Sequence, residues 1–566
     1  MGSGHILVYA FDVLMEIYRE VGYSDRDAAL SIVENNIFGM DIDKRAYQLA
    51  YFAVMMKARS YNRHALTKGI SNNLSVVEES NSIDKFVCGG LTTDSEQNKI
   101  GEYLVEAYRD AQEIGTLQTI EKKDYKGFAT YLNNIENSTG QIDLFSTAWL
   151  NDTLPQMVQL AKQAEIMSNK YAVVCTNPPY MNKLEGQLKK FVVDNYKPYS
   201  GDLFSVFIYR NFDYCKIDGY SAFMTPFVWM SISSYEPLRQ YILDNKTIVS
   251  LIQMEYSAFE EATVPICSFV LKNSLDKGEK AYYFNLTNFK GGMEVQKQKV
   301  IEALNDRNCG FYYEKNSDCL KHIQGNPFTA YWATQKTLEA YESANLGEIA
   351  EPRHGLATSN NNLFLKRWFE VSIKRCSVYD LNNQSDYKWF PMNKGGSYRK
   401  WYGSNEWLIN YENDGYEIKK YAAAIYKSAS RTIQNTKYYF KQSLTWSALT
   451  SGNFSVRWSN EGAIFGSGGY SAFVYDKDIF YILALMNSKV NSIFIKIVSP
   501  TLNYEVGHIK TIHVVMESKT KNTVEILTEE LVNISKTDWD SFETSWDFIT
   551  HPFFVMLRIT VCRTFR

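Results

Sequence analysis

The sequence predicts an α/β protein whose first half forms a parallel, doubly wound sheet. Short apolar runs typical of buried strands alternate with helical patterns up to about residue 275, where the alternation fades. Polar or acidic residues follow several of these strands, at the edge where open α/β sheets bind ligands. The expected strands are 36–41, 74–77, 171–175, 221–224, 248–253 and 266–271, and the expected helices are 6–20, 44–59 and 202–212.

Composition limits the class of protein before any motif is considered. The 566 residues are 45% hydrophobic and 22% charged, an ordinary globular balance that excludes a disordered chain. No run of 18 apolar residues predicts a membrane span, and no secretory signal is expected. The eight cysteines form no C-x-x-C pair and lack zinc-ligand spacing, so we expect reduced thiols, a cytoplasmic location and no metal.

Positive charge is concentrated in residues 351–510. This block holds 20 Lys and Arg against 12 Asp and Glu, a balance of +8 on a chain whose net charge is −3. It is also rich in aromatic residues, on which bases can stack. The block therefore predicts a nucleic-acid surface, with a solvated basic face over an aromatic core as the equal alternative.

The motif Asn177-Pro178-Pro179-Tyr180 follows an apolar strand and carries the clearest chemical signal. Two prolines fix the backbone and remove two N–H donors, so the corner presents carbonyl oxygens. The Asn177 oxygen beside a fixed carbonyl forms a pair of acceptors that suits an exocyclic amine. Tyr180 could stack on the ring that carries the amine. The alternative interpretation is a plain Asn-Pro turn.

Other residues are candidates for binding a cofactor. Gly2 and Gly4 precede a helix and could form a glycine turn at the cofactor's carboxylate, although such a sequence is also typical of flexible starts. Asp41 ends a strand where ribose hydroxyls are commonly bound, or else it caps a helix. Glu79 could meet an adenine amine, and Asp202 opens a helix that could line the pocket.

Several motifs together resemble the amino-methylating DNA methyltransferases, most closely the PglX-like adenine methyltransferases of the BREX phage-defence system. The resemblance implies a Rossmann-like sheet that uses S-adenosylmethionine. It also implies that Asn177, Pro178 and Tyr180 hold a flipped adenine, that Asp41 binds the cofactor ribose, and that Gly2 and Gly4 contact its methionine part. The supporting motifs are Gly2-Ser3-Gly4-His5, Gly39-Met40-Asp41-Ile42-Asp43, Glu78-Glu79-Ser80-Asn81, the 259–265 stretch, Lys388-Trp389-Phe390-Pro391, Asn393-Lys394-Gly395-Gly396, Arg399-Lys400-Trp401-Tyr402-Gly403 and the 500–507 stretch.

By this resemblance, residues 1–275 form a catalytic domain with a helical insertion at about 82–168. A connecting region at 276–350 precedes a mixed α/β DNA target-recognition domain at 351–515 and a C-terminal helical segment at 516–566. The residues expected to bind DNA phosphates are Arg353, Lys366, Arg367, Lys394, Arg399 and Lys400.

Two departures from the family pattern concern the ends of the chain. Family members have a strand and an Asp-Pro-Ala-Cys-like stretch before the glycine turn, so we expect the first strand of the sheet to be missing. Residues 555–566 do not continue the family pattern. We therefore expect a fragment of a larger enzyme, which would leave the two neighbours of the missing strand unpaired.

The function that the sequence predicts is methylation of adenine N6 in double-stranded DNA, for phage defence or restriction-modification, with other defence proteins as candidate partners. Three alternatives stay open: methylation of a protein glutamine or of RNA, a DNA-binding role without turnover, and N4 methylation of cytosine, because the same acceptors fit each amine or amide.

Overall fold

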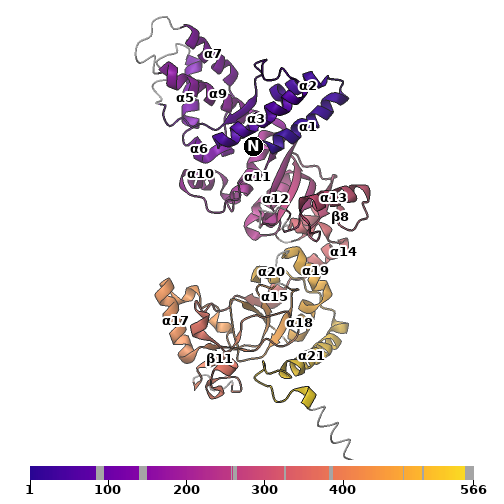
Figure 1. Cartoon of the computed structure of the whole chain (residues 1–566). Coiled ribbons are helices and arrows are strands. Elements are labelled where there is room, and N and C mark those ends of the chain that lie inside the picture. Colours follow the sequence, from indigo (N-terminus) through magenta and orange to yellow (C-terminus); the bar gives the residue numbers. More distant parts are fainter. Residues whose placement is uncertain are drawn as a thin grey trace, which may run out of the picture. The chain divides into compact units, whose positions relative to one another are not determined.

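The structure is a computed structural model of the chain, with two compact units, Met1–Asp318 and Cys319–Arg566 (Figure 1). It describes residues 1–83, 95–138, 149–256, 258, 264–323, 325, 327–380, 386–450, 452–475, 477–499 and 503–554. The family-like stretches 259–265 and 500–507 lie partly outside this description, and 555–566 lies wholly outside it.

The first unit begins with a parallel two-stranded sheet and its helices. The helix α1 (His5–Glu20) buries Phe11 and Met15 from its apolar stripe. The strands β1 (Phe38–Asp41) and β2 (Asn73–Val76) pair in parallel and are joined by α3 (Lys44–Tyr61). Asp43 caps α3 by accepting hydrogen bonds from the Arg45 and Ala46 N–H groups, which confirms the predicted cap.

A six-stranded sheet follows, and it corrects the prediction of an all-parallel sheet. The strand order is β3-β4-β6-β5-β7-β8, and β6 runs antiparallel to both of its neighbours. Because β6 runs antiparallel to β5, these two strands need no crossover helix between them. The strands are β3 (Tyr171–Thr176), β4 (Cys215–Pro226), β5 (Thr247–Gln253), β6 (Ile266–Lys272), β7 (Lys280–Asn285) and β8 (Tyr312–Asn316).

Residues 280–316, expected to lie in the connecting region, extend this sheet. Strand β7 pairs in parallel with β5, and β8 pairs antiparallel with β7. The helix α13 (Gly292–Asn305) joins the two strands. The first unit therefore continues to Asp318.

Helices occupy much of the stretch between β2 and β3. The helices α5 (Ser95–Ala107), α7 (Tyr125–Ser138) and α9 (Leu154–Ser168) pack together (Figure 1) around a buried cluster that includes Leu104, Tyr125 and Leu160. The other helices of this unit are α2 (Asp25–Ser31), α6 (Ala111–Ile114), α10 (Gly186–Tyr196), α11 (Leu203–Tyr214) and α12 (Glu236–Asn245).

The second unit contains two four-stranded sheets. The first is antiparallel with the order β14-β13-β16-β9, and the second has the order β10-β12-β11-β15. The strands are β9 (Ala350–Arg353), β10 (Leu365–Arg367), β11 (Trp389–Asn393), β12 (Trp407–Asn410), β13 (Ser443–Ser447), β14 (Val456–Ser459), β15 (Ile464–Phe465) and β16 (Gly469–Val474).

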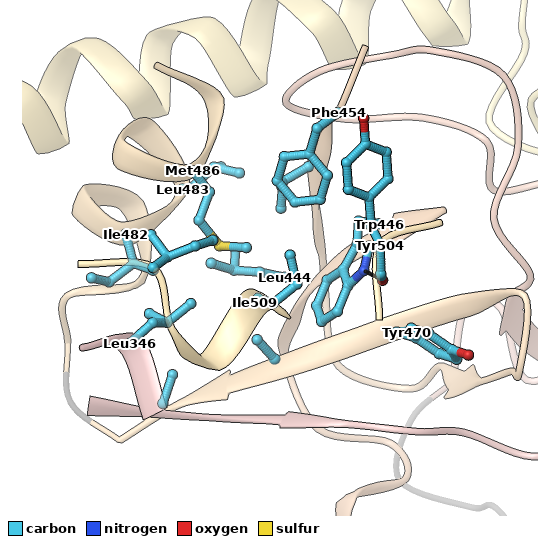
Figure 2. Packing of buried hydrophobic residues seen from close by; sticks show 14 of the residues in the cluster. Leu346, Leu444, Trp446, Phe454, Tyr470, Ile482, Leu483, Met486, Tyr504 and Ile509 are labelled. Carbon is cyan, nitrogen blue, oxygen red and sulfur yellow. Dashed lines mark hydrogen bonds between the residues drawn. The ribbon is translucent and has the colours of Figure 1, made fainter. Parts of the chain in front are cut away.

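Apolar side chains from the first of these sheets pack against helices of the same unit. Figure 2 shows Leu444 and Trp446 of β13 beside Ile482, Leu483 and Met486 from α18 (Ile479–Asn487). The indole N–H of Trp446 donates to the Tyr504 carbonyl at 3.0 Å, so this buried ring keeps a polar partner. The other helices are α14 (Gln335–Glu339), α15 (Leu346–Ile349), α16 (Asn361–Phe364), α17 (Glu412–Tyr426), α19 (Lys489–Val498), α20 (Val506–Lys510) and α21 (Ser518–Asp540).

Within the described ranges, no single helix has the length and apolar character needed to cross a membrane. The helices α18 and α19 have this length and apolar character only when they are counted together, and a bend of 71° separates them.

Candidate active site

The 177–180 loop leaves β3 directly at its carboxyl end. Pro178 is buried, whereas Asn177, Pro179 and Tyr180 are exposed, with 40% of Tyr180 accessible. The buried proline anchors the corner, and its neighbours face solvent. The loop therefore presents an amide and a phenol ring at the edge of the sheet, as the sequence predicts.

Tyr180 occupies one of the acceptors predicted for the substrate. Its hydroxyl donates to Asn177 Oδ1 at 3.1 Å and lies 3.5 Å from the Met224 carbonyl oxygen. The Tyr180 ring also makes an edge contact with Phe204, at 6.4 Å between centroids. Burial raises the pKa of Tyr180 to about 12, so its hydroxyl stays a neutral donor near neutral pH.

Asp202 connects this loop to α11. Its carboxylate accepts hydrogen bonds from the Met181 N–H at 2.8 Å and from the Phe204 N–H at 3.3 Å, and only 8% of the residue is exposed. The first bond fixes the end of the 177–180 loop and the second caps the helix. The role of Asp202 in cofactor binding stays a prediction.

The structure brings the N-terminal glycine turn to Asp41. The Gly2 N–H donates to Asp41 Oδ2 at 2.8 Å, and the Asp43 N–H donates to Asp41 Oδ1 at 3.0 Å. Gly4 has φ +91°, and a Cβ atom there would lie 2.8 Å from Ala50 Cα. Only glycine permits this approach of the α1 N-terminus to α3.

Glu79 follows β2 and is half-buried. Its carbonyl accepts a hydrogen bond from Gln156 Nε2 at 2.8 Å, while the backbone of Glu78 bonds to both polar atoms of the Gln163 side chain. These bonds from α9 fix the backbone of the segment. The predicted contact of the Glu79 side chain with an adenine amine stays a prediction.

Three of the six cations predicted to bind DNA lie in ion pairs within the second unit. Arg353 pairs with Glu351, Arg367 pairs with Glu406, and Arg399 pairs with Asp538 at 3.0 Å. Glu406 and Asp538 are distant in sequence from their partners, so local patterns do not predict these two pairs. Each pair reduces the charge available to a phosphate.

The three lysines of the set have other surroundings. Lys400 donates to the Asn487 carbonyl at 2.7 Å and so caps the C-terminus of α18, and Lys366 donates to the Asn362 carbonyl at 3.1 Å. Lys394 Nζ lies 3.8 Å from the centroid of the Trp407 ring. In the part of the chain that the structure describes, none of the three forms an ion pair with an acid.

The class of protein that this site resembles is a restriction-modification methylase. Residues 35–259 match the family model described as Eco57I restriction-modification methylase. The matched region contains Asp41, Glu79, the 177–180 loop and Asp202.

Particular relatives are adenine-specific methyltransferases. The chain is 35% identical to the adenine-specific methyltransferase PglX of Lacticaseibacillus casei (strain Zhang) and 33% identical to the adenine-specific methyltransferase BrxX of Escherichia coli O9:H4 (strain HS). Each match covers 97% of this chain and 46% of the relative. The chain thus spans about half the length of these curated relatives.

Solved structures with a similar fold come from restriction-modification enzymes. The Type IIL enzyme MmeI, solved in complex with DNA, matches with a TM-score of 0.50 at 10% identity, over 95% of this chain and 70% of that one. A nuclease-deletion mutant of the Type ISP enzyme LlaGI matches with the same TM-score and identity, over 94% of this chain and 44% of that one. At this identity the similarity shows a shared mixed α/β fold.

Proposed function

We propose that this chain is the catalytic and DNA-recognition part of an adenine-specific DNA methyltransferase that acts on N6 of a flipped adenine, in phage defence or restriction-modification. The observation that carries the proposal is the geometry of the 177–180 loop. A rigid diproline corner at the end of β3 exposes an amide oxygen and a phenol ring side by side. The adenine-specific relatives support the choice of base.

Two hydrogen-bond acceptors and the Tyr180 ring would hold the extruded adenine. Asn177 Oδ1 and the Pro178 carbonyl would accept the two N–H groups of the adenine amine, which aims its lone pair away from the loop. The Tyr180 ring would stack on the base and offset the few kcal/mol that extrusion from the duplex costs. The Tyr180 hydroxyl already bonds to Asn177 Oδ1, so it competes with the adenine amine for this oxygen.

We further infer that the two sheets of the first unit belong to one Rossmann-like sheet with a place for one more strand between them. Phe38 at the start of β1 contacts Tyr171 at the start of β3, with 4.9 Å between ring centroids. Among the described strands, β1 pairs only with β2 and β3 only with β4. Val173 of β3 is 57% exposed, as expected beside a free edge.

The residues around the glycine turn fit S-adenosylmethionine. Gly2 has φ +56° and no atom within 4 Å of the position a Cβ would take, so its backbone is open to a ligand. Asp41 Oδ1 accepts a hydrogen bond from the Asp43 N–H at 3.0 Å and keeps a lone pair for a ribose hydroxyl. Gly2, Gly4 and Asp41 would hold the cofactor, which when bound supplies an electrophilic methyl group. Glu79 and Asp202 are further candidates for its pocket.

The second unit would contain the DNA target-recognition region, within residues 351–515, with double-stranded DNA as its partner. The net positive charge of 351–510 supports this assignment, although Arg353, Arg367 and Arg399 contribute less than their number implies because acids pair with them. Other defence proteins remain proposed partners.

The experiment is a methyl-transfer assay with tritiated S-adenosylmethionine and duplex DNA, RNA and protein as separate acceptors. We expect label in DNA, and we expect Asn177→Ala to reduce transfer by about two orders of magnitude, the size typical of a preorganised hydrogen-bonding group at a reacting centre. Label in protein or RNA instead of DNA would contradict the proposal. DNA binding by the wild-type chain without cofactor binding in calorimetry would favour a DNA-binding role without turnover.

A further inference from the structure

The second unit contains an open cavity of about 370 Å³. Its walls come from the 356–361 segment, from Met392 and Lys394 at the end of β11, and from the 466–468 segment after β15. Ser359, Asn361 and Ser467 are exposed at its mouth, so a ligand from solvent can reach it.

Backbone contacts fix the shape of this cavity. The Leu356 N–H donates to the Phe465 carbonyl at 2.9 Å, the Ser467 N–H donates to the Leu356 carbonyl at 3.0 Å, and the Gly466 N–H donates to the Asn393 carbonyl at 2.8 Å. A Cβ on Gly395 would lie 2.4 Å from the Gly468 carbonyl oxygen, so the chains approach as closely as glycine allows. The walls are therefore preorganised.

Lys394 supplies the cation of the wall. Its ammonium lies 3.8 Å from the Trp407 centroid, and in the described ranges no acid forms an ion pair with it. Arg367 also lies over Trp407, at 4.0 Å, but its charge is paired with Glu406. Burial and then the neighbouring Arg367 lower the pKa of Lys394, and Glu406 opposes this shift only in part, so a bound anion would further stabilise the charged form of Lys394.

The other polar groups of the wall are also suited to an anion. Thr358 Oγ1 donates to Asn361 Oδ1 at 2.6 Å, which leaves the Asn361 amide nitrogen as a donor toward other partners. The hydroxyls of Ser359 and Ser467 can donate as well. None of the described lining residues is an acid.

We propose that this cavity binds a backbone phosphate of DNA, with Lys394 as its cation and Asn361 and Ser467 as donors. The inference rests on the proposed DNA substrate and names where the second unit holds it. Lysine, asparagine and serine are common partners of phosphate oxygens. The cavity is larger than a phosphate group. Its apolar residues Leu356, Leu365 and Met392 form a surface against which the adjoining deoxyribose could pack.

The test compares DNA binding by wild-type chain, Lys394→Gln and Lys394→Arg across a salt series, with a 30-base-pair duplex. One lost phosphate contact lowers the slope of log affinity against log salt by about 0.9, so we expect that change for Lys394→Gln and a near wild-type slope for Lys394→Arg. Lys519→Gln is the matched control, since it removes the same charge from an exposed position on α21, outside the proposed recognition region. Its slope should stay at the wild-type value.

Thermal unfolding verifies that each variant is folded. Asn361→Ala, at an exposed position, gives an independent test, and we expect it to weaken DNA binding.

The outcomes separate this inference from the proposed function. If wild-type chain binds DNA and Lys394→Gln keeps its salt slope, the phosphate site is wrong while the methyltransferase proposal stands. If Lys394→Gln instead changes the preference between sequences, the cavity contacts a base, and the phosphate assignment is overturned. A thermal shift with inorganic phosphate alone, lost in Lys394→Gln without any change in the DNA slope, would identify a free-phosphate site and also overturn it. No binding of wild-type chain to DNA would contradict the proposed substrate and this inference together.

Discussion

The hydrogen bond from Tyr180 to Asn177 predicts an unusual result for Tyr180→Phe. In the structure the Tyr180 hydroxyl lies 3.1 Å from Asn177 Oδ1, the oxygen proposed to accept the adenine amine. Removing the hydroxyl frees this acceptor and keeps the ring, including its edge contact with Phe204. The variant should therefore hold the extruded base at least as well as the wild type.

The magnitude follows from the net strength of one hydrogen bond. A typical intramolecular hydrogen bond contributes about 0.5–1.5 kcal/mol, which is roughly a 2- to 13-fold change in an equilibrium constant. The contact at 3.5 Å to the Met224 carbonyl is too long to add much. We expect Tyr180→Phe to tighten binding of a duplex with a mismatched, easily extruded adenine by about that factor.

The assay is fluorescence anisotropy with this duplex, in the presence of S-adenosylmethionine. Tyr180→Ala is the control, because loss of the ring removes base stacking of about 1–3 kcal/mol and should weaken binding. Weaker binding by Tyr180→Phe than by the wild type would refute the reasoning, since the hydroxyl would then assist the bound state. Binding that is equal in all three proteins would show that Tyr180 does not contact the base.

Three further predictions concern positions that support the site and the fold. Gly4→Ala should lower the free energy of unfolding, measured by chemical denaturation, by about 2–4 kcal/mol, because a Cβ is disfavoured both by φ +91° and by the 2.8 Å approach to Ala50 Cα. The control is Gly69→Ala, which has φ +63° but open space around it and should cost only about 1 kcal/mol. Asp202→Ala should reduce kcat for methyl transfer while costing about 1 kcal/mol of stability, since it releases the Met181 N–H and uncaps α11; an unchanged kcat would show that the anchor is unimportant. Hydrogen bonds from Tyr438, Arg353 and Tyr475 lower the pKa of Glu351 from 4.5 to about 2, so its stabilising effect is complete above about pH 4.5 and is lost as the pH falls toward 2. Glu351→Gln should therefore destabilise the chain at pH 7 by about 1–2 kcal/mol. The free energy of unfolding of this variant should also change less between pH 4.5 and pH 2 than that of the wild type.

Local patterns predicted the elements that position the site. The apolar spacing in 6–20 and the cap at Asp43 correspond to α1 and α3, and the run ending at Cys175 corresponds to β3. These features depend on neighbouring residues, so sequence alone can identify them. The glycine turn and Asp41 were candidates both from their place in the predicted elements and from the resemblance to known methyltransferases, and the structure brings them together.

Features that depend on distant residues were not predictable in this way. The direction of β6 depends on its pairing with β4 and β5, and a short apolar run does not encode that choice. The ion pairs of Arg367 and Arg399 depend on acids brought near by the fold. The wall of the Lys394 cavity likewise combines segments that are distant in sequence, and the glycine pairs at 395–396 and 468–469 approach each other closely there.

Mass spectrometry of nucleosides tests the central claim most directly. Duplex DNA would be incubated with the wild-type chain and S-adenosylmethionine, then digested, with Asn177→Ala treated in parallel. The account predicts N6-methyldeoxyadenosine from the wild-type reaction and its near absence from the variant. N4-methyldeoxycytidine in its place would contradict the assignment of adenine as the target base. Equal amounts of N6-methyldeoxyadenosine from both proteins would contradict the role assigned to the oxygen of Asn177.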